Sequence, residues 1–357
     1  MSLSKRCGRP PQHRAFQPGK RHMDLLPSIS RSSGLDKDGD ALTDFTVQEE
    51  YREYIQGKLE EYWRRRGAPD AEKGRQDVEQ NLLILFRKLR EGVLSSNRSD
   101  EFALKVYETS VHLSILFHSP GQTTSTLSHL LPELYLRVFP SPPPFADSGH
   151  PAFPTTILAL LHNLISGYPS QSRYHELLHS LPRTFLPRDS DAYRWMDDLT
   201  RTLRRRNYAR LERLTQRDAF ASFAAPDKVT SSGHAGKDGS TADADNRAKS
   251  LHLEALCTLV DAVRAKARET AWRILRGAYR ELTCPLPGRT AEVPLTTSEW
   301  LARSLTLRSV LPQRIDHSIS IAQLVDDWLN GKCKEGEVRR KEGIEGRWIV
   351  CKVPVKA

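Results

Sequence analysis

The segment HELLH at residues 175–179 is the sharpest candidate for catalytic chemistry in this sequence. On a helix, His175 and His179 share one face and could bind zinc, with Glu176 beside them as a general base. A zinc site needs a third ligand, but no HxxGxxH pattern follows, and Pro182 comes three residues later. We keep a zinc hydrolase as an alternative. We favour a helix with Tyr174 inward and both histidines at the surface.

Other catalytic patterns are weaker still. GKDGS at 236–240 lies in a low-complexity segment and lacks the pattern of a phosphate-binding loop, and the sequence has no nucleophile elbow. The five cysteines include no pair at C-x-x-C spacing, which argues against zinc ribbons and redox motifs. We therefore expect a protein without catalytic residues, metal or cofactor.

An arginine-rich stretch at 201–217 carries seven arginines against the single acid Glu212. A helix is expected over 208–221, and its spacing places Arg210, Arg213 and Arg217 on one face. Such a stripe can contact successive phosphates without reading sequence. A solvated helix face, or arginines paired with acidic partners, is the competing interpretation. The candidate nucleic-acid contacts here are Arg204, Arg205, Arg206, Arg210, Arg213 and Arg217.

A second basic group follows near the end of the chain, where residues 337–355 alternate around a glycine-containing turn and predict a β-hairpin. The preceding helix carries Asp326 and Asp327, and its first cation is Lys332, which is poor for reading a major groove. We therefore expect the hairpin to contact a nucleic-acid backbone. Its candidate residues are Arg339, Arg340, Lys341 and Arg347, while Trp300 and Trp328 are candidates for packing or for docking a partner protein.

The elements that must position these residues are helices, because apolar residues recur at helical spacing and no alternating pattern precedes residue 330. The last part of the chain contains a capping box in LTTSEW at 295–300, with Thr296 as N-cap. The expected helices cover 47–63, 78–93, 102–116, 123–138, 155–166, 171–180, 190–205 and 208–221, followed by a long helix over 248–282.

Composition divides the chain into three parts. Residues 1–40 read as a disordered basic tail, 41–282 as a solenoid of helical hairpins, and 283–357 as a winged helix with a small β-hairpin. Within the helical part we expect a flexible proline-rich connector at 140–154 and a disordered insertion at 225–247.

The charge balance favours a polyanionic partner such as nucleic acid: 54 Lys+Arg against 44 Asp+Glu give a net charge of +10. The basic tail lacks the apolar core of a signal peptide, and the longest apolar runs are too short to cross a bilayer. With an odd number of cysteines, these features predict an intracellular protein in a reducing compartment. The tail is either a nuclear import signal or a solvated segment.

The segment KLREGVLSSNRSDEFALKVYETSVHLSI at 88–115 resembles the Sac-three/GANP/Thp-three family of PCI-domain proteins, whose members show RQDLTVQ, NEF and VYE in this order. LPELY at 131–135 is similar to the family's LKxLY, and NYARL after residue 206 to its NYxRF. The matched residues are Leu89, Arg90, Glu101, Phe102, Val106, Tyr107 and Glu108. Gly92 departs from the pattern, because the family usually has an acid there. The cysteine-containing motif that precedes this domain in the Sac-three branch is absent here, which favours the Thp-three-like branch or a divergent third one.

The resemblance implies a PCI module, which is a helical solenoid capped by a winged helix. It also implies a nuclear role in transcription-coupled mRNA processing and export, a second PCI-domain protein as partner, and a small acidic disordered subunit. We accordingly expect a non-enzymatic scaffold that offers a basic surface to RNA or single-stranded DNA, without a membrane or small-molecule substrate. The expected location is the nucleus, with the cytoplasm as a second location. A PCI subunit of a proteasome-lid, COP-nine-signalosome or initiation-factor complex is the alternative within this class.

Overall fold

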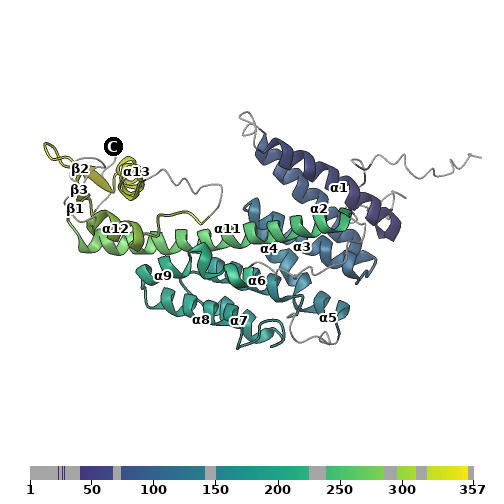
Figure 1. Ribbon diagram of the computed structural model, residues 1–357. Helices are drawn as coiled ribbons and strands as arrows, with labels where there is room; N and C mark the ends of the chain where they lie inside the picture. Colours follow the sequence, from purple (N-terminus) through teal and green to yellow (C-terminus); the bar gives the residue numbers. More distant parts are fainter. Residues whose placement is uncertain are drawn as a thin grey trace, which may run out of the picture. The chain divides into compact units, whose positions relative to one another are not determined.

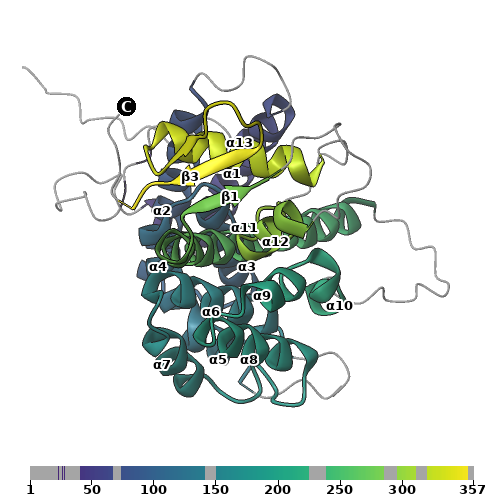
Figure 2. The same ribbon diagram turned by 90° about the vertical axis from the view of Figure 1, so that its left-hand side faces the viewer.

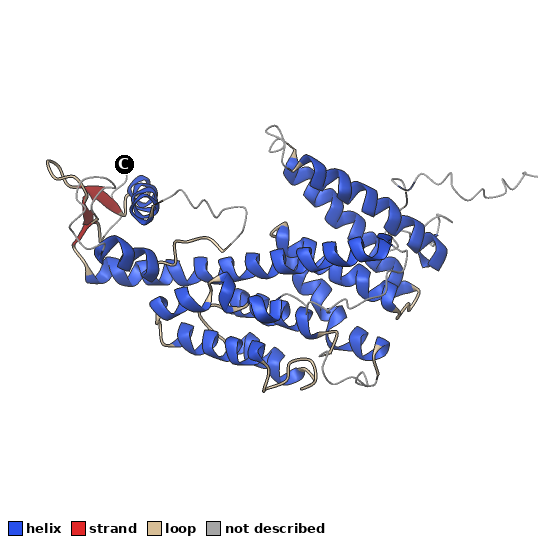
Figure 3. Cartoon of the chain, in the orientation of Figure 1, coloured by secondary structure: helices blue, strands red, loops and turns tan. Residues whose placement is uncertain are grey.

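The structure, a computed structural model, describes residues 41–66, 74–140, 150–224, 239–284, 296–310 and 320–352, together with Met23, Leu26 and Ser28. These residues form two compact units that divide between Arg98 and Ser99. Figure 3 shows that the described chain is mostly helical, with strands confined to its C-terminal part. The predicted helical chain with a terminal β-hairpin is thereby confirmed. Within the described part, no helix is long and apolar enough to cross a bilayer.

The first unit is a helical hairpin of α1 (Phe45–Arg65) and α2 (Arg75–Ser95), preceded by the short 3-10 helix η3 (Ala41–Thr43). The Asp44 carboxylate accepts from the Thr46 backbone N–H at 2.8 Å and so caps α1. Apolar residues at helical spacing on both helices face each other and form the core of this unit. They include Tyr51, Ile55, Leu59, Leu82, Phe86 and Leu89.

Part of the predicted disordered tail is ordered against the first unit. Leu26 and Ser28 are buried, and Lys88 Nζ donates to the Leu26 carbonyl at 2.8 Å. Leu26 therefore contacts the first unit, which composition alone does not indicate. The remaining residues of the predicted tail lie outside the described part of the chain.

The helical part of the second unit is built around the long helix α11 (Gly239–Ala278), which packs on α3 and α6 (Figure 1). At 40 residues it is about 60 Å long, since a helix rises 1.5 Å per residue. The other helices of this part are α3 (Glu101–Leu116), α4 (Pro120–His129), α5 (Tyr135–Val138), α6 (Phe153–Gly167), α7 (Ser172–Ser180), α8 (Asp191–Arg204), α9 (Tyr208–Leu214) and α10 (Ala221–Ala224).

Two of the predicted helices are interrupted. The helix expected over 123–138 is broken by η4 (Leu130–Leu134), where Leu131 has extended backbone angles. The helix expected over 208–221 ends at Leu214, and the 3-10 turn η6 (Arg217–Ala219) follows. The Trp195 indole N–H donates to the Leu214 carbonyl at 2.8 Å. This tertiary contact takes up an acceptor in the last turn of α9, so the helix can end there.

The long helix differs from its predicted span at both ends. It begins at Gly239, inside the insertion predicted to be disordered over 225–247, whereas 225–238 lie outside the described residues. A helix already fixed by packing extends readily into a segment rich in alanine. It ends at Ala278 rather than near Leu282, because residues 281–283 form a strand.

The C-terminal elements are β1 (Glu281–Thr283), α12 (Thr296–Ser304), α13 (Ile321–Lys334), β2 (Val338–Arg340) and β3 (Arg347–Val350). The strands form an antiparallel sheet in the order β1-β3-β2, with Leu282 opposite Trp348. No strand was predicted before residue 330, so β1 corrects that expectation, and the boundary drawn at 282/283 falls within it. Leu282 and Trp348 are buried with residues of α12 and α13 in one small core.

Two further sequence predictions fall partly outside the described residues. Thr296 is the first residue of α12, and the capping contact predicted for its side chain lies outside the described residues. Of the proline-rich connector, 141–149 also lie outside them, but His150 is buried and its ring centroid lies 4.4 Å from that of Phe185. The end of the connector is therefore packed rather than flexible.

Candidate nucleic-acid interface

The arginine cluster, defined as Arg204, Arg205, Arg206, Arg210, Arg213 and Arg217, lies at the end of α8, on α9 and in the turns beside them. All six side chains are exposed. At the end of α8 the Arg205 backbone N–H donates to the Arg201 carbonyl, and Asn207 caps α9 through its side-chain oxygen, so the turn at 205–207 is fixed at both ends. Arg206 has a φ of 54°, which turns the chain sharply between the two helices.

Only part of the arginine cluster is neutralised within the described chain. Arg210 pairs with Asp198 at 3.0 Å. Neighbouring Arg201, outside the cluster, pairs with Asp197 at 2.9 Å. No described carboxylate lies within ion-pair distance of Arg205, Arg206, Arg213 or Arg217. These four cations are therefore available to an external anion.

The predicted single-helix stripe is not observed, because Arg217 lies in η6 beyond the end of α9. Leu211 is buried as predicted, and Leu214 is half-buried. The lone acid of the stretch, Glu212, does not offset the surface charge. It is buried and accepts from Arg264 Nη2 of α11 at 2.6 Å. The exposed charge of α9 is thus more positive than its sequence indicates.

The electrostatic surroundings of Tyr208 include Arg206 and Arg273 of α11. Burial raises the pKa of Tyr208 to about 12, neighbouring Tyr168 adds to the rise, and the two arginines oppose it. Arg273 is exposed and belongs to a different part of the sequence.

The HELLH motif lies at the edge of the same surface, in an open cleft of about 690 Å³ that also contains Arg204. Arg204 Nη2 lies 3.4 Å from His175 Nε2, and His179 Nδ1 lies 2.6 Å from the His175 carbonyl oxygen. Burial and the cation of Arg204 lower the pKa of His175. A cation beside one imidazole opposes a divalent metal there. Among the described residues, no group of three His, Cys, Asp or Glu side chains gathers around a possible metal position.

The hairpin cations are less available than the arginine cluster. Arg340 lies over the Trp348 ring and donates to Asn330 at 2.9 Å. Lys341 and Arg347 both approach Glu281 of β1, at 2.9 and 3.8 Å. Arg339 is exposed, with no carboxylate of the described chain in ion-pair distance. Sequence reasoning missed the two contacts with Glu281 because that residue comes from a strand that it did not predict.

The hairpin and the arginine cluster are not one surface. Figures 1 and 2 show α11 and α12 between α9 on one side and the sheet on the other. The two predicted basic groups thus lie on different sides of this layer.

The two candidate tryptophans differ in exposure. Trp328 is half-buried, and its ring meets Trp272 edge-on at 4.7 Å, so it belongs to the C-terminal core. Trp300 is 38% exposed and lies 5.5 Å from the ring of Tyr279, which is 42% exposed. An exposed aromatic pair suits a partner contact. Tyr279 was not singled out from the sequence, since it lies beyond the last turn of α11.

No family model, curated protein sequence or solved structure matches this chain.

Proposed function

We propose that this protein is a non-enzymatic helical scaffold that binds RNA or single-stranded DNA through the arginine cluster. The observation that carries the proposal is the group of four exposed arginines, Arg205, Arg206, Arg213 and Arg217, without carboxylate partners in the described chain. Guanidinium groups contact phosphates through several donors, and such contacts release counterions without requiring a particular base sequence.

The proposal includes a PCI-type architecture, with helices leading into a winged helix. Supporting it, two residues of the motifs that carry the family resemblance meet in the core: Glu108 of VYE accepts from the hydroxyl of Tyr135, the last residue of LPELY, at 2.5 Å. Tyr135 also contacts Thr155 of α6 at 2.8 Å. The order α12, α13, β2, β3 agrees with a winged helix, and β1 completes its sheet.

As a scaffold of this class, the protein would join a nuclear complex in mRNA processing and export. There it would contact a second PCI-domain protein and a small acidic subunit, with the exposed pair of Trp300 and Tyr279 as a docking surface. Affinity purification of the tagged protein from nuclei tests this part. Recovery of mRNA-export subunits supports it, whereas recovery of proteasome-lid, signalosome or initiation-factor subunits would contradict it.

The nucleic-acid part is tested by changing Arg205, Arg206, Arg213 and Arg217 together to Gln, which keeps good helix propensity and leaves buried Leu211 untouched. The full-length variant should bind a fluorescent single-stranded RNA at least about tenfold more weakly than the parent. A matched variant removes the same charge from four exposed arginines outside the cluster: Arg137, Arg183, Arg188 and Arg194. The matched variant should retain most of the affinity. Equal losses in both variants would show that only net charge matters.

A further inference from the structure

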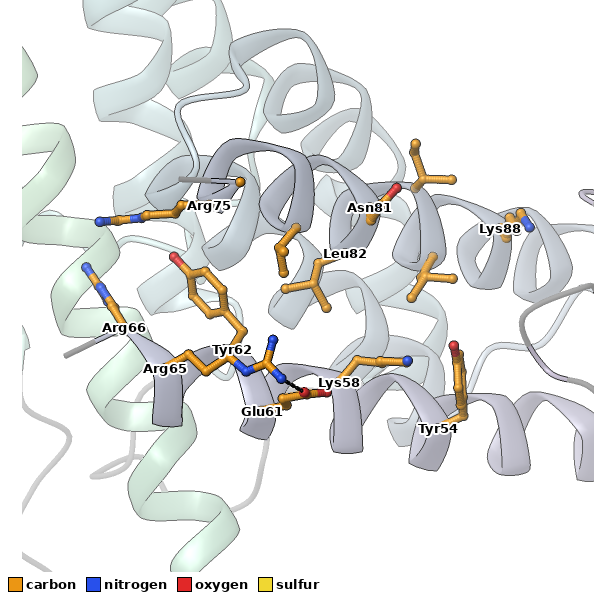
Figure 4. Close-up of a pocket in the computed structure, with 14 residues that line it drawn as sticks. Tyr54, Lys58, Glu61, Tyr62, Arg65, Arg66, Arg75, Asn81, Leu82 and Lys88 are labelled. Atoms are coloured by element: carbon orange, nitrogen blue, oxygen red, sulfur yellow. Dashed lines mark ion pairs between the residues drawn. The ribbon is translucent and has the colours of Figure 1, made fainter. Parts of the chain in front are cut away.

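A groove of about 740 Å³ runs between α1 and α2 in the first unit, away from the arginine cluster along the sequence. Its lining extends from Tyr54 to Arg66 on α1 and from Gly74 to Lys88 on α2. At 1.5 Å per residue, each side is about 20 Å long, or roughly four helical turns. Figure 4 shows the two helices along the groove with their side chains between them. An elongated groove of this length suits a helix better than a compact small molecule.

The floor of the groove is apolar and repeats at helical spacing. Val78, Leu82 and Leu85 line it at intervals of four and three residues along α2. Val78 is 43% exposed and neighbouring Ile84 is 40% exposed, so the apolar surface reaches solvent. Such a stripe between two helices is the form of surface that receives the apolar face of a third helix.

The walls of the groove are basic. Among the described residues, five cations line it, namely Lys58, Arg65, Arg66, Arg75 and Lys88, against the single acid Glu61, which pairs with Arg65 at 2.6 Å. Arg75 pairs with Glu79. Figure 4 shows these cations distributed from one end of the groove to the other. Lys58 and Lys88 have no carboxylate within ion-pair distance among the described residues, which leaves positive charge on both sides of the apolar floor.

The basic walls argue against residues 1–22 of this chain as the occupant. Residues 1–22 contain six Lys and Arg residues and no acid, so they would be repelled. The later residue Leu26 meets the groove at Lys88, whose Nζ donates to the Leu26 carbonyl. We propose that the groove docks an amphipathic helix of a partner protein, about 14 residues long, with an apolar stripe flanked by Asp and Glu. This surface is separate from the proposed nucleic-acid interface, and either can fail without the other.

The test uses the full-length protein and two stapled, fluorescent peptides of about 16 residues. Both carry the same leucine stripe, but one has Glu and the other Lys at the flanking positions. The acidic peptide should bind at least about tenfold more tightly in fluorescence anisotropy. Val78→Glu should weaken it at least about tenfold, and Lys58→Glu with Lys88→Glu should reverse the preference.

Matched controls change equivalent exposed positions on the same helices but outside the groove: Arg64→Glu on α1 and Leu94→Glu on α2. These variants should bind like the parent, and circular dichroism should show all variants folded. Equal affinity for both peptides, no binding of the acidic peptide, or unchanged binding by folded Val78→Glu would overturn the proposal.

Discussion

The guanidinium of Arg264 and the carboxylate of Glu212 meet inside the second unit, with 2.6 Å between Nη2 and Oε2 and neither side chain more than 5% exposed. Arg264 also donates to Thr215 Oγ1 at 2.7 Å and to the Arg308 carbonyl at 2.6 Å. These bonds join α11 to the end of α9 and to the segment after α12. They therefore fix the helix that presents part of the arginine cluster.

Arg264→Met should destabilise the protein by about 3–5 kcal/mol, because it leaves the Glu212 carboxylate buried without its partner. Burial already raises the pKa of Glu212, against the opposing effect of Arg264. The double variant Arg264→Met with Glu212→Leu should lose less stability than Arg264→Met alone. Urea unfolding measures both. If the double variant is the less stable of the two, the buried pair is not the main contribution of these side chains.

A buried histidine pair predicts acid sensitivity. His112 of α3 and His252 of α11 have ring centroids 5.4 Å apart, and burial lowers their pKa values to about 3 and about 4. In the unfolded chain both titrate near pH 6.5, so the unfolded state binds more protons between about pH 4 and 6.5. Stability should therefore fall as the pH drops through this window, by up to about 1.4 kcal/mol per unit for each histidine.

The variant His112→Leu with His252→Leu should flatten the pH dependence of the unfolding free energy in that window. His118→Asn is the control, since His118 is exposed and its φ of 51° suits asparagine. It should keep the parental slope. An unchanged slope in the double leucine variant would show that other groups govern acid unfolding.

Gly92 is a second position at which we expect a substitution to lower the stability of the protein. A Cβ at this position would lie 2.6 Å from the Leu42 carbonyl oxygen, which is backbone and cannot move aside alone. Gly92→Ala should thus lower the thermal midpoint by several degrees, corresponding to about 1–3 kcal/mol. A Cβ at Gly57 of α1 would meet no atom within 4 Å, so Gly57→Ala should stabilise the protein by about 0.5–1 kcal/mol. Similar effects from both changes would contradict the close approach of η3 to α2.

The HELLH motif should be structural. The purified protein should contain no stoichiometric zinc by elemental analysis, and His175→Ala should leave its thermal midpoint within about 0.5 kcal/mol of the parent, as for an ordinary surface change. Added zinc should not raise that midpoint. One zinc per chain that is lost in His175→Ala would replace the scaffold proposal with a zinc hydrolase.

The sequence predicts what depends on local periodicity and misses what depends on distant partners. The 3.6-residue spacing locates most helices, since an apolar stripe must face a core. It does not reveal β1, because a strand of three residues has too short a pattern and is stabilised by pairing with β3 late in the chain. Gly92 stood out as a departure from the family pattern, but only Leu42 explains why a side chain is excluded there.

In the candidate site, too, local sequence features were predictable and contacts with distant residues were not. The excess of arginine over acid is readable from composition, and exposure of all six cluster residues agrees with it. The burial of Glu212 is not readable, because its partner Arg264 lies 52 residues away. The pairing of the hairpin cations with Glu281 also required the fold. Both corrections favour the arginine cluster over the hairpin as the place for phosphate contacts.

The salt dependence of RNA affinity tests this assignment most directly. The slope of log Kd against log salt reports the phosphates that the protein neutralises. Changing Arg205, Arg206, Arg213 and Arg217 to Gln should reduce this slope by roughly two to three units and weaken binding to all sequences alike. The matched variant of Arg137, Arg183, Arg188 and Arg194 should keep the parental slope. A parental slope and affinity in the cluster variant would contradict the account and leave Arg339 and the hairpin as the remaining candidate.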